Sequence, residues 1–277
     1  MEFNSKVFNL NTNGNVKYLT FKKLEDYKFI NHAFSTKFAG VSKNEFSSMN
    51  LGFNGIDANE NVIENYHIFC DAAGFDFNSL VASSQDHHTN IRCVEENDKG
   101  IGIYRPKDMQ SVDGLLTNVK NITLVTYYAD CTPIFYLDPK NKVIGLAHAG
   151  WRGTVLGIAP KMIETMKEKY NSNPSDIICA IGPAIGKCCY EVDEPVYEQF
   201  AAIDGVDIES ISKPTTQGKY MIDLWNTNKY RLMSCGVREE NIEVGDICTK
   251  CRSDLLFSHR ATNGKRGTLA AMLCIKK

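Results

Sequence analysis

Two apolar segments, 133–138 and 143–148, stand on either side of the tetrapeptide PKNK. Proline suits an early turn position and asparagine tolerates left-handed backbone, so these four residues predict a tight turn. We therefore expect an antiparallel hairpin with His148 opposite Pro133. Cys131 lies two residues before Pro133. This register places Cys131 and His148 at the same end of the hairpin, away from the turn.

Helical and strand patterns alternate along the rest of the chain. Apolar positions recur with helical spacing in 59–73, 155–170 and 223–235, and a further helix is expected after Pro195. Thr154 is the expected N-cap of the second of these helices. We expect one domain over residues 1–277, of the α/β or α+β class with a mixed sheet. Segments rich in β-branched and aromatic residues predict strands at 122–128, 133–137, 143–147, 177–181 and 269–275.

Charge and hydropathy argue against several classes of protein. The chain has 31 Lys and Arg against 33 Asp and Glu, and this net charge of −2 argues against a dedicated nucleic-acid binder or a membrane-surface protein. No apolar run is long enough to span a membrane, and the N-terminal residues contain no apolar block, so we expect a cytoplasmic protein. In that compartment the ten cysteines are expected to be free thiols, packing groups, metal ligands or catalytic groups.

A thiol and an imidazole at one strand end have two chemical uses. Cys131 and His148 could bind zinc, or they could form a nucleophile pair in which the histidine helps to generate the thiolate. Another imidazole is available in the segment SSQDHH, where His87 and His88 are adjacent. Successive residues of a strand point to opposite faces, so only one of these two is expected to reach the site. Two histidines and one cysteine with an open fourth position are typical of a catalytic zinc site.

The same residues also allow plainer interpretations. A lone cysteine or histidine is usually structural, and the segment QDHHTN could equally form a polar loop. Asp130 either holds a backbone amide in a turn or supplies a carboxylate for proton transfer or ligand orientation. Cys248 and Cys251 form a single CxxC pair, whereas a structural zinc site usually has four ligands, so a core or turn role is favoured. The adjacent cysteines 188 and 189 are expected to pack near the site.

Eight segments of the sequence resemble the YfiH family, which is also known as laccase-like or polyphenol oxidase. Their order is that of the family, and they span nearly the whole chain. The combination of YADC with AHAGWRGT is highly specific. The segments are HAFSTKFAGVS (32–42), SSMNLGFN (47–54), SSQDHH (83–88), VDGLLTN (112–118), TYYADCTPIFYLDP (126–139), IGLAHAGWRGT (144–154), AIGPAIGKCCYEV (180–192) and CTKCRSDLLFSHRATNGKRG (248–267).

The resemblance implies a sandwich of two mixed β-sheets flanked by helices, and a zinc-dependent enzyme that acts on purine nucleosides. The family is associated with phosphorolysis of adenosine, inosine, guanosine and methylthioadenosine, and with adenosine deamination. Its metal ligands correspond here to His87, Cys131 and His148, with His88 as the alternative to His87. The implied cofactor is Zn²⁺, with copper the less favoured metal. The implied partners are a purine nucleoside and phosphate.

Phosphorolysis also needs an anion site near C1′ of the ribose. Arg152 stands just before an expected helix start, where backbone N–H groups and the helix dipole favour an anion. The other positions expected to bind substrate or phosphate are Lys37, Asn50 and Arg260, with Arg266 as a further candidate. Lys37 stands where the family usually has arginine. Because lysine lacks the bidentate fork of arginine, this departure bears most directly on phosphorolysis.

Deamination would need a proton shuttle other than the usual one. No histidine is followed two places later by glutamate, so Asp130 and Asp113 are the candidates. A Cys–His hydrolase or amidase would instead use Cys131 as nucleophile and His148 as base. Copper phenol oxidase chemistry generally uses several histidines, and this chain has six in all. A non-catalytic metal-binding domain is the remaining alternative. The sequence leaves the preferred nucleoside and the oligomeric state open.

Overall fold

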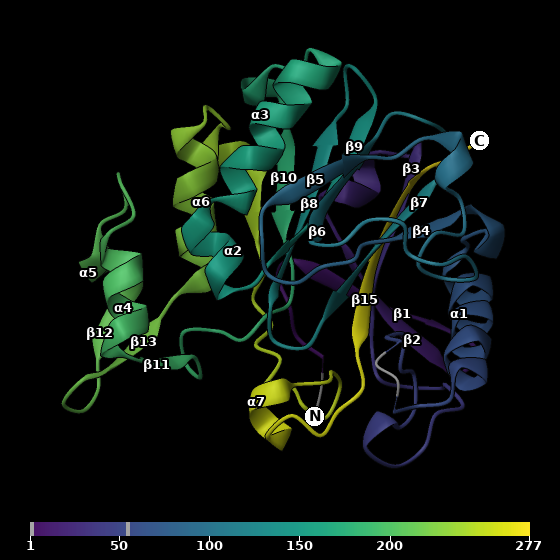
Figure 1. The fold of residues 1–277 in the computed structure, drawn as a ribbon, viewed down its shortest axis with the longest axis horizontal. Coiled ribbons are helices and arrows are strands. Elements are labelled where there is room, and N and C mark those ends of the chain that lie inside the picture. The colour runs from purple at the N-terminus through teal and green to yellow at the C-terminus, as the bar shows by residue number, and fades with distance from the viewer. Residues whose placement is uncertain (1–2, 54–55) are drawn as a thin grey trace.

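Two β-sheets packed face to face form the centre of the molecule, and helices cover their outer sides (Figure 1). This computed structural model describes residues 3–53 and 56–277. The first sheet, in spatial order, consists of β1 (Phe8–Asn13), β2 (Val16–Phe21), β3 (Ile30–Ser35), β15 (Leu269–Ile275), β7 (Thr123–Tyr128) and β4 (Leu80–Ala82). The second sheet consists of β14 (Ile242–Val244), β10 (Ile178–Ile181), β8 (Thr132–Asp138), β9 (Val143–Ala149), β6 (Val112–Thr117) and β5 (Asn90–Cys93).

Both sheets are mixed, as the sequence predicts. Strands β4 and β7, β5 and β6, and β10 and β14 pair in parallel, and the remaining neighbours pair antiparallel. A small third sheet contains β11 (Glu191–Asp193), β13 (Lys219–Ile222) and β12 (Ser212–Pro214). The α-helices are α1 (Asn59–Ala73), α2 (Trp151–Leu156), α3 (Ile158–Tyr170), α4 (Glu194–Ala201), α5 (Ile208–Ile211), α6 (Leu224–Ser234) and α7 (His259–Thr262). Short 3-10 helices lie at Leu24–Asp26, Asn44–Phe46, Phe77–Ser79, Glu96–Asp98, Pro174–Asp176 and Glu239–Asn241.

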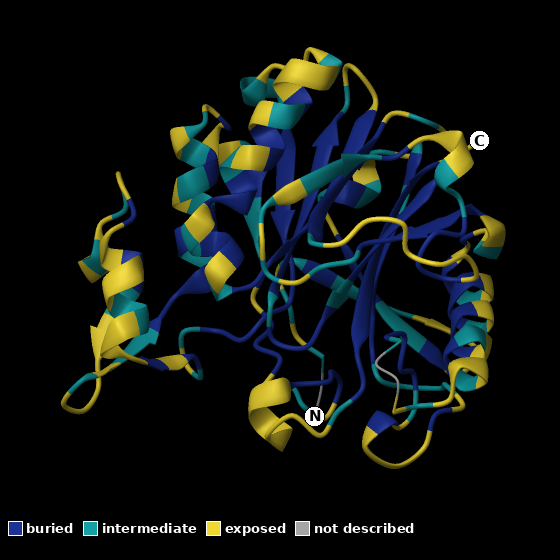
Figure 2. Ribbon diagram, viewed as in Figure 1, coloured by how far each residue is buried: buried dark blue, intermediate teal, exposed yellow. Residues whose placement is uncertain are grey.

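Strand β8 shows why the sheets stack in this way. Its residues are all buried, and their side chains alternate between two cores. Phe135 and Leu137 face the space between the two sheets, whereas Ile134 and Tyr136 pack on the outer side against α3. A strand that is buried on both faces has a nearly continuous run of apolar residues, and the sequence of β8 has such a run. Figure 2 shows the central strands of both sheets buried and the outward faces of the helices exposed, whereas the edge strands β1 and β5 are only partly buried.

The outer helices use the faces that their periodicity predicts. Val62, Tyr66 and Phe69 of α1 pack on the first sheet, and Met162 and Met166 of α3 pack on the second. Figure 1 shows α4, α5 and the small third sheet to one side of the sandwich, beyond α6. No α-helix in the described part of the chain combines the length and the apolar character that a membrane crossing would need.

The expected helix start at Thr154 is wrong. Thr154 lies inside α2, which begins at Trp151 and has Gly150 as its N-cap. The left-handed residue Gly157, with φ of 92°, then separates α2 from α3. The hydroxyl of Thr154 accepts a 3.0 Å hydrogen bond from the side chain of Asn228 in α6, so it ties two helices together rather than capping one.

The hairpin of β8 and β9 has the predicted register. Pro133 lies opposite His148, and Asp138 lies opposite Val143 at the turn end. Oxygen Oδ1 of Asp138 accepts the N–H groups of Lys140 and Asn141, which closes the turn. The opposite end of the hairpin therefore carries Cys131 just before β8 and His148 near the end of β9.

Candidate metal centre

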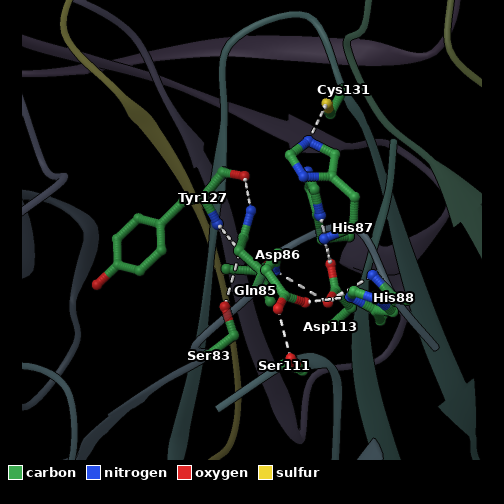
Figure 3. A network of polar contacts seen from close by, with 12 residues as sticks. Ser83, Gln85, Asp86, His87, His88, Ser111, Asp113, Tyr127 and Cys131 are labelled. Carbon is green, nitrogen blue, oxygen red and sulfur yellow. Dashed lines mark hydrogen bonds and ion pairs between the residues drawn. The ribbon is translucent and has the colours of Figure 1, made fainter. Parts of the chain in front are cut away.

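Three side chains from separate segments bring potential metal-ligand atoms together. His87 comes from the loop between β4 and β5, Cys131 from the connection between β7 and β8, and His148 from β9. Their ligand atoms all lie within 4.8 Å of one another. Figure 3 shows the ring of His87 directed at Cys131, and the distance from His87 Nε2 to Cys131 Sγ is 3.8 Å. The spacing-based expectation that Cys131 and His148 share one end of the hairpin is confirmed.

Asp113, on β6, holds two of these three residues, one by its side chain and the other by its backbone. Its Oδ1 accepts a 2.7 Å hydrogen bond from Nδ1 of His148, which leaves Nε2 of His148 as the ring nitrogen available to Cys131 or to a metal ion. The same carboxylate accepts the backbone N–H groups of Asp86, His87 and His88 at 3.0–3.1 Å. Asp113 and His148 are both almost fully buried. A carboxylate that orients a histidine in this way is the usual outer partner of a metal-binding imidazole.

The loop geometry distinguishes His87 from His88. His87 has a φ of 74°, and its ring faces Cys131. His88 is exposed, and its Nδ1 lies 2.7 Å from Oδ1 of Asp86, on the other side of the loop (Figure 3). Only one of the two histidines reaches the cluster, as expected. Residues 86–88 form a loop and not a strand. The conformation of this loop is held by the hydrogen bonds from its three backbone N–H groups to Asp113.

The charges within the cluster shift the protonation of its members. Burial acts to raise the pKa of the Cys131 thiol, but the charge of His148 and the hydrogen bonds from His148 and His87 outweigh it and lower the pKa to about 6. Burial acts to lower the pKa of His148, but the Cys131 thiolate and Asp113 together raise it to about 9. Without a cation, Cys131 and His148 therefore form a thiolate–imidazolium pair at neutral pH.

Close approach at Gly150 leaves no room for a larger residue. A Cβ at this position would lie 2.6 Å from Cδ2 of His87 and 3.2 Å from Sγ of Cys131. The backbone of Gly150 has an ordinary φ of −64°, so glycine is needed here for space and not for conformation. The glycine in the motif AHAGWRGT thus allows the backbone to pass directly beside the three ligand atoms.

A cavity of about 330 Å³ opens beside the cluster. Both His87 and Cys131 line it, so the ligand atoms face an accessible space. The wall combines apolar and aromatic side chains with cations, an arrangement typical of small-molecule sites. The other lining residues are Ala129, Asp130, Trp151, Ile185, Tyr190, His259, Arg260 and Arg266.

The arginines predicted to bind an anion lie at or near this cavity. Arg260 lines it, stacks 5.6 Å from the Tyr190 ring, and donates to the carbonyl of Glu191. Arg266 also lines it; its Nη1 bonds Thr268, and its buried Nε has no hydrogen-bond partner among the described residues. Arg152 is exposed and stacks on Trp151 at 4.3 Å.

Lys37 and Asn50 do not line the cavity. The amine of Lys37 donates to the carbonyl of Ser253 at 2.5 Å. Asn50 is fully buried; its Oδ1 accepts from the N–H groups of Gly52 and Thr268, and its Nδ2 donates to the carbonyl of Gly52 and to Asp57. Both side chains tie the segment after β3 to segments that precede β15.

Asp130 lies at the cavity wall, but both of its carboxylate oxygens accept hydrogen bonds from other residues of the chain. Its backbone is left-handed, with φ of 84°. Oδ1 accepts from the hydroxyl of Thr249 and Oδ2 from the backbone N–H of Arg260, both at 2.6 Å. The plainer interpretation, that Asp130 holds a backbone amide, describes these contacts. The carboxylate that orients a ligand is Asp113, which the sequence suggested only as a proton shuttle.

Comparisons with known proteins agree with this architecture. The family described as multi-copper polyphenol oxidoreductase laccase matches residues 31–276. The protein named purine nucleoside phosphorylase YlmD of Bacillus subtilis is 36% identical over 245 residues, which is 88% of each chain. A purine nucleoside phosphorylase of Bacteroides thetaiotaomicron is 30% identical over 263 residues, covering 94% of this chain and 97% of its own.

Solved structures have the same fold. The crystal structure of the Bacillus licheniformis hypothetical protein YfiH superposes with a TM-score of 0.91 at 32% identity, covering 96% of this chain and 99% of that one. The structure of YlmD from Geobacillus stearothermophilus gives 0.89 at 33% identity, covering 97% and 99%. The chain therefore belongs to the family described as multi-copper polyphenol oxidoreductase laccase, the family of the YfiH and YlmD proteins.

Proposed function

We propose that this chain is a zinc-dependent purine nucleoside phosphorylase that also deaminates adenosine. The observation that carries the proposal is the convergence of His87, Cys131 and His148 beside a cavity that His87 and Cys131 line, with His148 already oriented by Asp113. Relatives that share most of this chain's length are named purine nucleoside phosphorylases, which gives the reaction class.

The donor set fits a divalent cation such as zinc. Zinc–sulfur bonds of about 2.3 Å and zinc–nitrogen bonds of about 2.0 Å in a tetrahedron put ligand atoms roughly 3.6 Å apart, close to the 3.8 Å between His87 and Cys131. Nδ1 of His148 is held by Asp113, so Nε2 is the atom presented as a ligand. Zinc held by three protein ligands supplies Lewis-acid activation at its remaining position.

The cavity suits a purine nucleoside in size and character. Its volume of about 330 Å³ lies in the range of small-molecule sites. Trp151 and Tyr190 offer aromatic surfaces on which a purine ring can stack, and Ile185 adds an apolar contact. In phosphorolysis the bond between C1′ and N9 breaks, a phosphate oxygen bonds to C1′, and the departing base takes up a proton. In deamination a water oxygen bonds instead to C6 of adenosine, the bond from C6 to the amino nitrogen breaks, and the amino group takes up a proton and leaves as ammonia.

Arg260 and Arg266 are the residues that we assign to phosphate. Both line the cavity, and Arg266 has a donor without a partner among the described residues. A phosphate oxygen would satisfy that donor and bring the compensating negative charge. We assign Arg152 to the cavity entrance, because it is exposed and stacks on Trp151, which lines the cavity. Asp130 holds the backbone of Arg260 and thus positions this residue.

The proposal is tested by metal analysis together with product analysis. Zinc-loaded wild type should convert adenosine to adenine and ribose 1-phosphate in phosphate, and to inosine without phosphate. His87→Ala should lose both the metal ion of this cluster and the turnover, whereas the matched variant His88→Ala should keep both. The proposal fails if fully metallated protein forms neither product. Arg266→Lys should raise KM for phosphate about tenfold while leaving KM for the nucleoside nearly unchanged.

A thiol hydrolase is the second candidate, and one observation favours it. Cys131, His148 and Asp113 form a nucleophile–base–carboxylate series, and the pKa of Cys131 is lowered to about 6. This function predicts that metal-free protein hydrolyses an ester or amide and that alkylation of Cys131 abolishes the activity. Turnover that requires added zinc excludes it.

Copper is the alternative metal that the family description suggests. Two histidines and a cysteine also occur in mononuclear copper sites, which add a weak axial ligand that is usually methionine. No methionine lines the cavity in the part of the chain that the structure describes. We therefore favour zinc, and the same metal analysis decides between the two.

A further inference from the structure

A second group of potential metal ligands lies apart from the cluster of His87, Cys131 and His148. Cys188 and Cys189 lie in a turn between β10 and β11, and Cys248 and Cys251 form the CxxC pair after β14. The sulfur atoms of all four lie within 4.8 Å of one another. Sγ of Cys251 is 3.6 Å from that of Cys188 and 3.5 Å from that of Cys189. The sequence showed two separate pairs, and the fold joins them into one group of four.

These distances match one shared cation better than a set of unrelated thiols. Four sulfurs at about 2.3 Å from a tetrahedral zinc lie roughly 3.8 Å apart, close to the two short distances around Cys251. A disulfide would require about 2.05 Å, so no pair in the group is bonded. The number of ligands, their type and the CxxC spacing are those of a closed structural zinc site.

Cys248 already has the backbone contacts that stabilise a sulfur anion. The N–H of Gly186 donates to its Sγ at 3.2 Å, and the N–H of Cys251 donates to the same atom. Cys248 is also the buried member of the group. Hydrogen bonds from two backbone donors favour the thiolate, which is the form that binds a metal. The donors come from both of the segments that the group connects.

We propose that Cys188, Cys189, Cys248 and Cys251 bind one zinc ion in a structural site separate from the catalytic one. All four positions are filled by protein sulfur, so this site has no open position for a substrate. Binding of the ion displaces the protons of the thiols that are not yet ionised, and no oxidation is involved. This proposal does not depend on the reaction that the other cluster catalyses.

The contacts around the four cysteines indicate what the ion would hold in place. Ala184 and Cys248 form an isolated β-bridge, and Thr249 next to Cys248 bonds the carboxylate of Asp130. Ile185 and Tyr190, on either side of the first cysteine pair, line the catalytic cavity. An ion at this site would therefore fasten one wall of the cavity to the segment beside Cys131. Its loss should loosen that wall without removing a catalytic ligand.

The test is the metal content of the full-length chain and of single-site variants, purified without chelator from zinc-supplemented cells. Wild type should carry about two zinc ions, and Cys188→Ser and Cys251→Ser about one each. Cys93→Ser, which changes a half-exposed thiol outside both groups, should still carry two. Cys131→Ala should lose only the catalytic ion. Zinc content in Cys251→Ser equal to that of wild type overturns the proposal.

Cobalt substitution of Cys131→Ala keeps the proposal testable if a serine variant fails to fold. With the catalytic ligand removed, the remaining cobalt should show the intense sulfur-to-metal charge transfer and tetrahedral bands of a four-thiolate site. Absence of those bands overturns the proposal, as does a disulfide within the group found by peptide mapping of the isolated, non-reduced protein. If Cys251→Ser loses metal and Cys131→Ala does not, the four-cysteine site is supported and the metal site at Cys131 is refuted.

Discussion

Nδ1 of His148 donates a 2.7 Å hydrogen bond to Oδ1 of Asp113, and both side chains are almost fully buried. The same carboxylate accepts the backbone N–H of His87. One acidic residue on β6 thus orients the imidazole of one ligand and the backbone of another. The candidate metal site is thus largely formed without a cation, so little conformational freedom would be lost if one bound.

Asp113→Asn should weaken metal binding by roughly 10- to 100-fold, because His148 loses its carboxylate partner. The measurement is competition for zinc against a chromophoric chelator. Asp86→Asn is the matched control, since Asp86 is the neighbouring carboxylate but contacts the exposed His88. Equal zinc affinity in the Asp113→Asn and Asp86→Asn proteins would show that Asp113 has no such role.

Gly150→Ala should disrupt the metal site while leaving the fold intact. The new Cβ would lie 2.6 Å from the ring of His87, which must turn away. We expect zinc affinity to fall at least about tenfold, as for the loss of a ligand's orientation. Gly153→Ala in the same helix is the control, because its Cβ would find contacts of 3.4 Å or more. Isothermal titration of both proteins with zinc distinguishes them, and retained affinity in Gly150→Ala would count against the geometry.

Alkylation of Cys131 in metal-free protein should show an acidic midpoint. The pKa of Cys131 is lowered to about 6, so the thiolate fraction and the rate rise as the pH increases through that value. An ordinary cysteine would reach its midpoint near about 8.5. Peptide mass spectrometry after brief iodoacetamide treatment measures the rate at each pH. A midpoint close to that of an ordinary thiol contradicts the proposed pairing, and zinc should protect Cys131 throughout.

Stability should fall in mild acid because of His32, which lies in the core between the sheets. Burial lowers the pKa of His32 to about 4, although Glu25 acts in the opposite direction, and the N–H of Phe21 occupies its Nε2. The unfolded chain, with a pKa near 6.5, binds a proton first as the pH falls from 6.5 towards 4. The free energy of unfolding should therefore decrease by about 3 kcal/mol across this window.

Urea unfolding of wild type and His32→Gln at several pH values measures this contribution. Glutamine keeps an acceptor for the Phe21 N–H but does not titrate. The difference between the two proteins should shrink as the pH falls through the window, because only wild type loses the contribution of His32. Contributions from the candidate metal ligands are the same in both proteins and cancel. Parallel pH profiles would show that His32 is not responsible.

Local patterns in the sequence predicted local geometry well. The turn PKNK set the register of β8 and β9, so Cys131 and His148 could be placed together from spacing alone. The choice between His87 and His88 required the loop course, which depends on three N–H groups bound to a carboxylate far along the chain. The prediction that Thr154 is an N-cap failed for a similar reason, because its hydroxyl accepts a hydrogen bond from Asn228 in α6, a segment distant in the sequence.

Relationships between distant segments were not predictable in the same way. The pairing of Asp113 with His148 depends on β6 lying beside β9, and no spacing in the sequence reports the order of strands in a sheet. The four-cysteine group depends on the bridge between Ala184 and Cys248. The CC and CxxC segments each contain two cysteines, and a structural zinc site needs four ligands. That match in number is the feature of the sequence from which the group could have been predicted.

Anomalous diffraction at the zinc absorption edge, from crystals of the zinc-loaded chain, would locate a metal ion bound by His87, Cys131 and His148. The account predicts a strong peak within bonding distance of Sγ of Cys131 and Nε2 of His87 and His148, about 2.0 to 2.3 Å from each. A second peak among the four cysteines would bear on the structural site alone. Zinc-loaded crystals with no peak between Cys131, His87 and His148 would contradict the account.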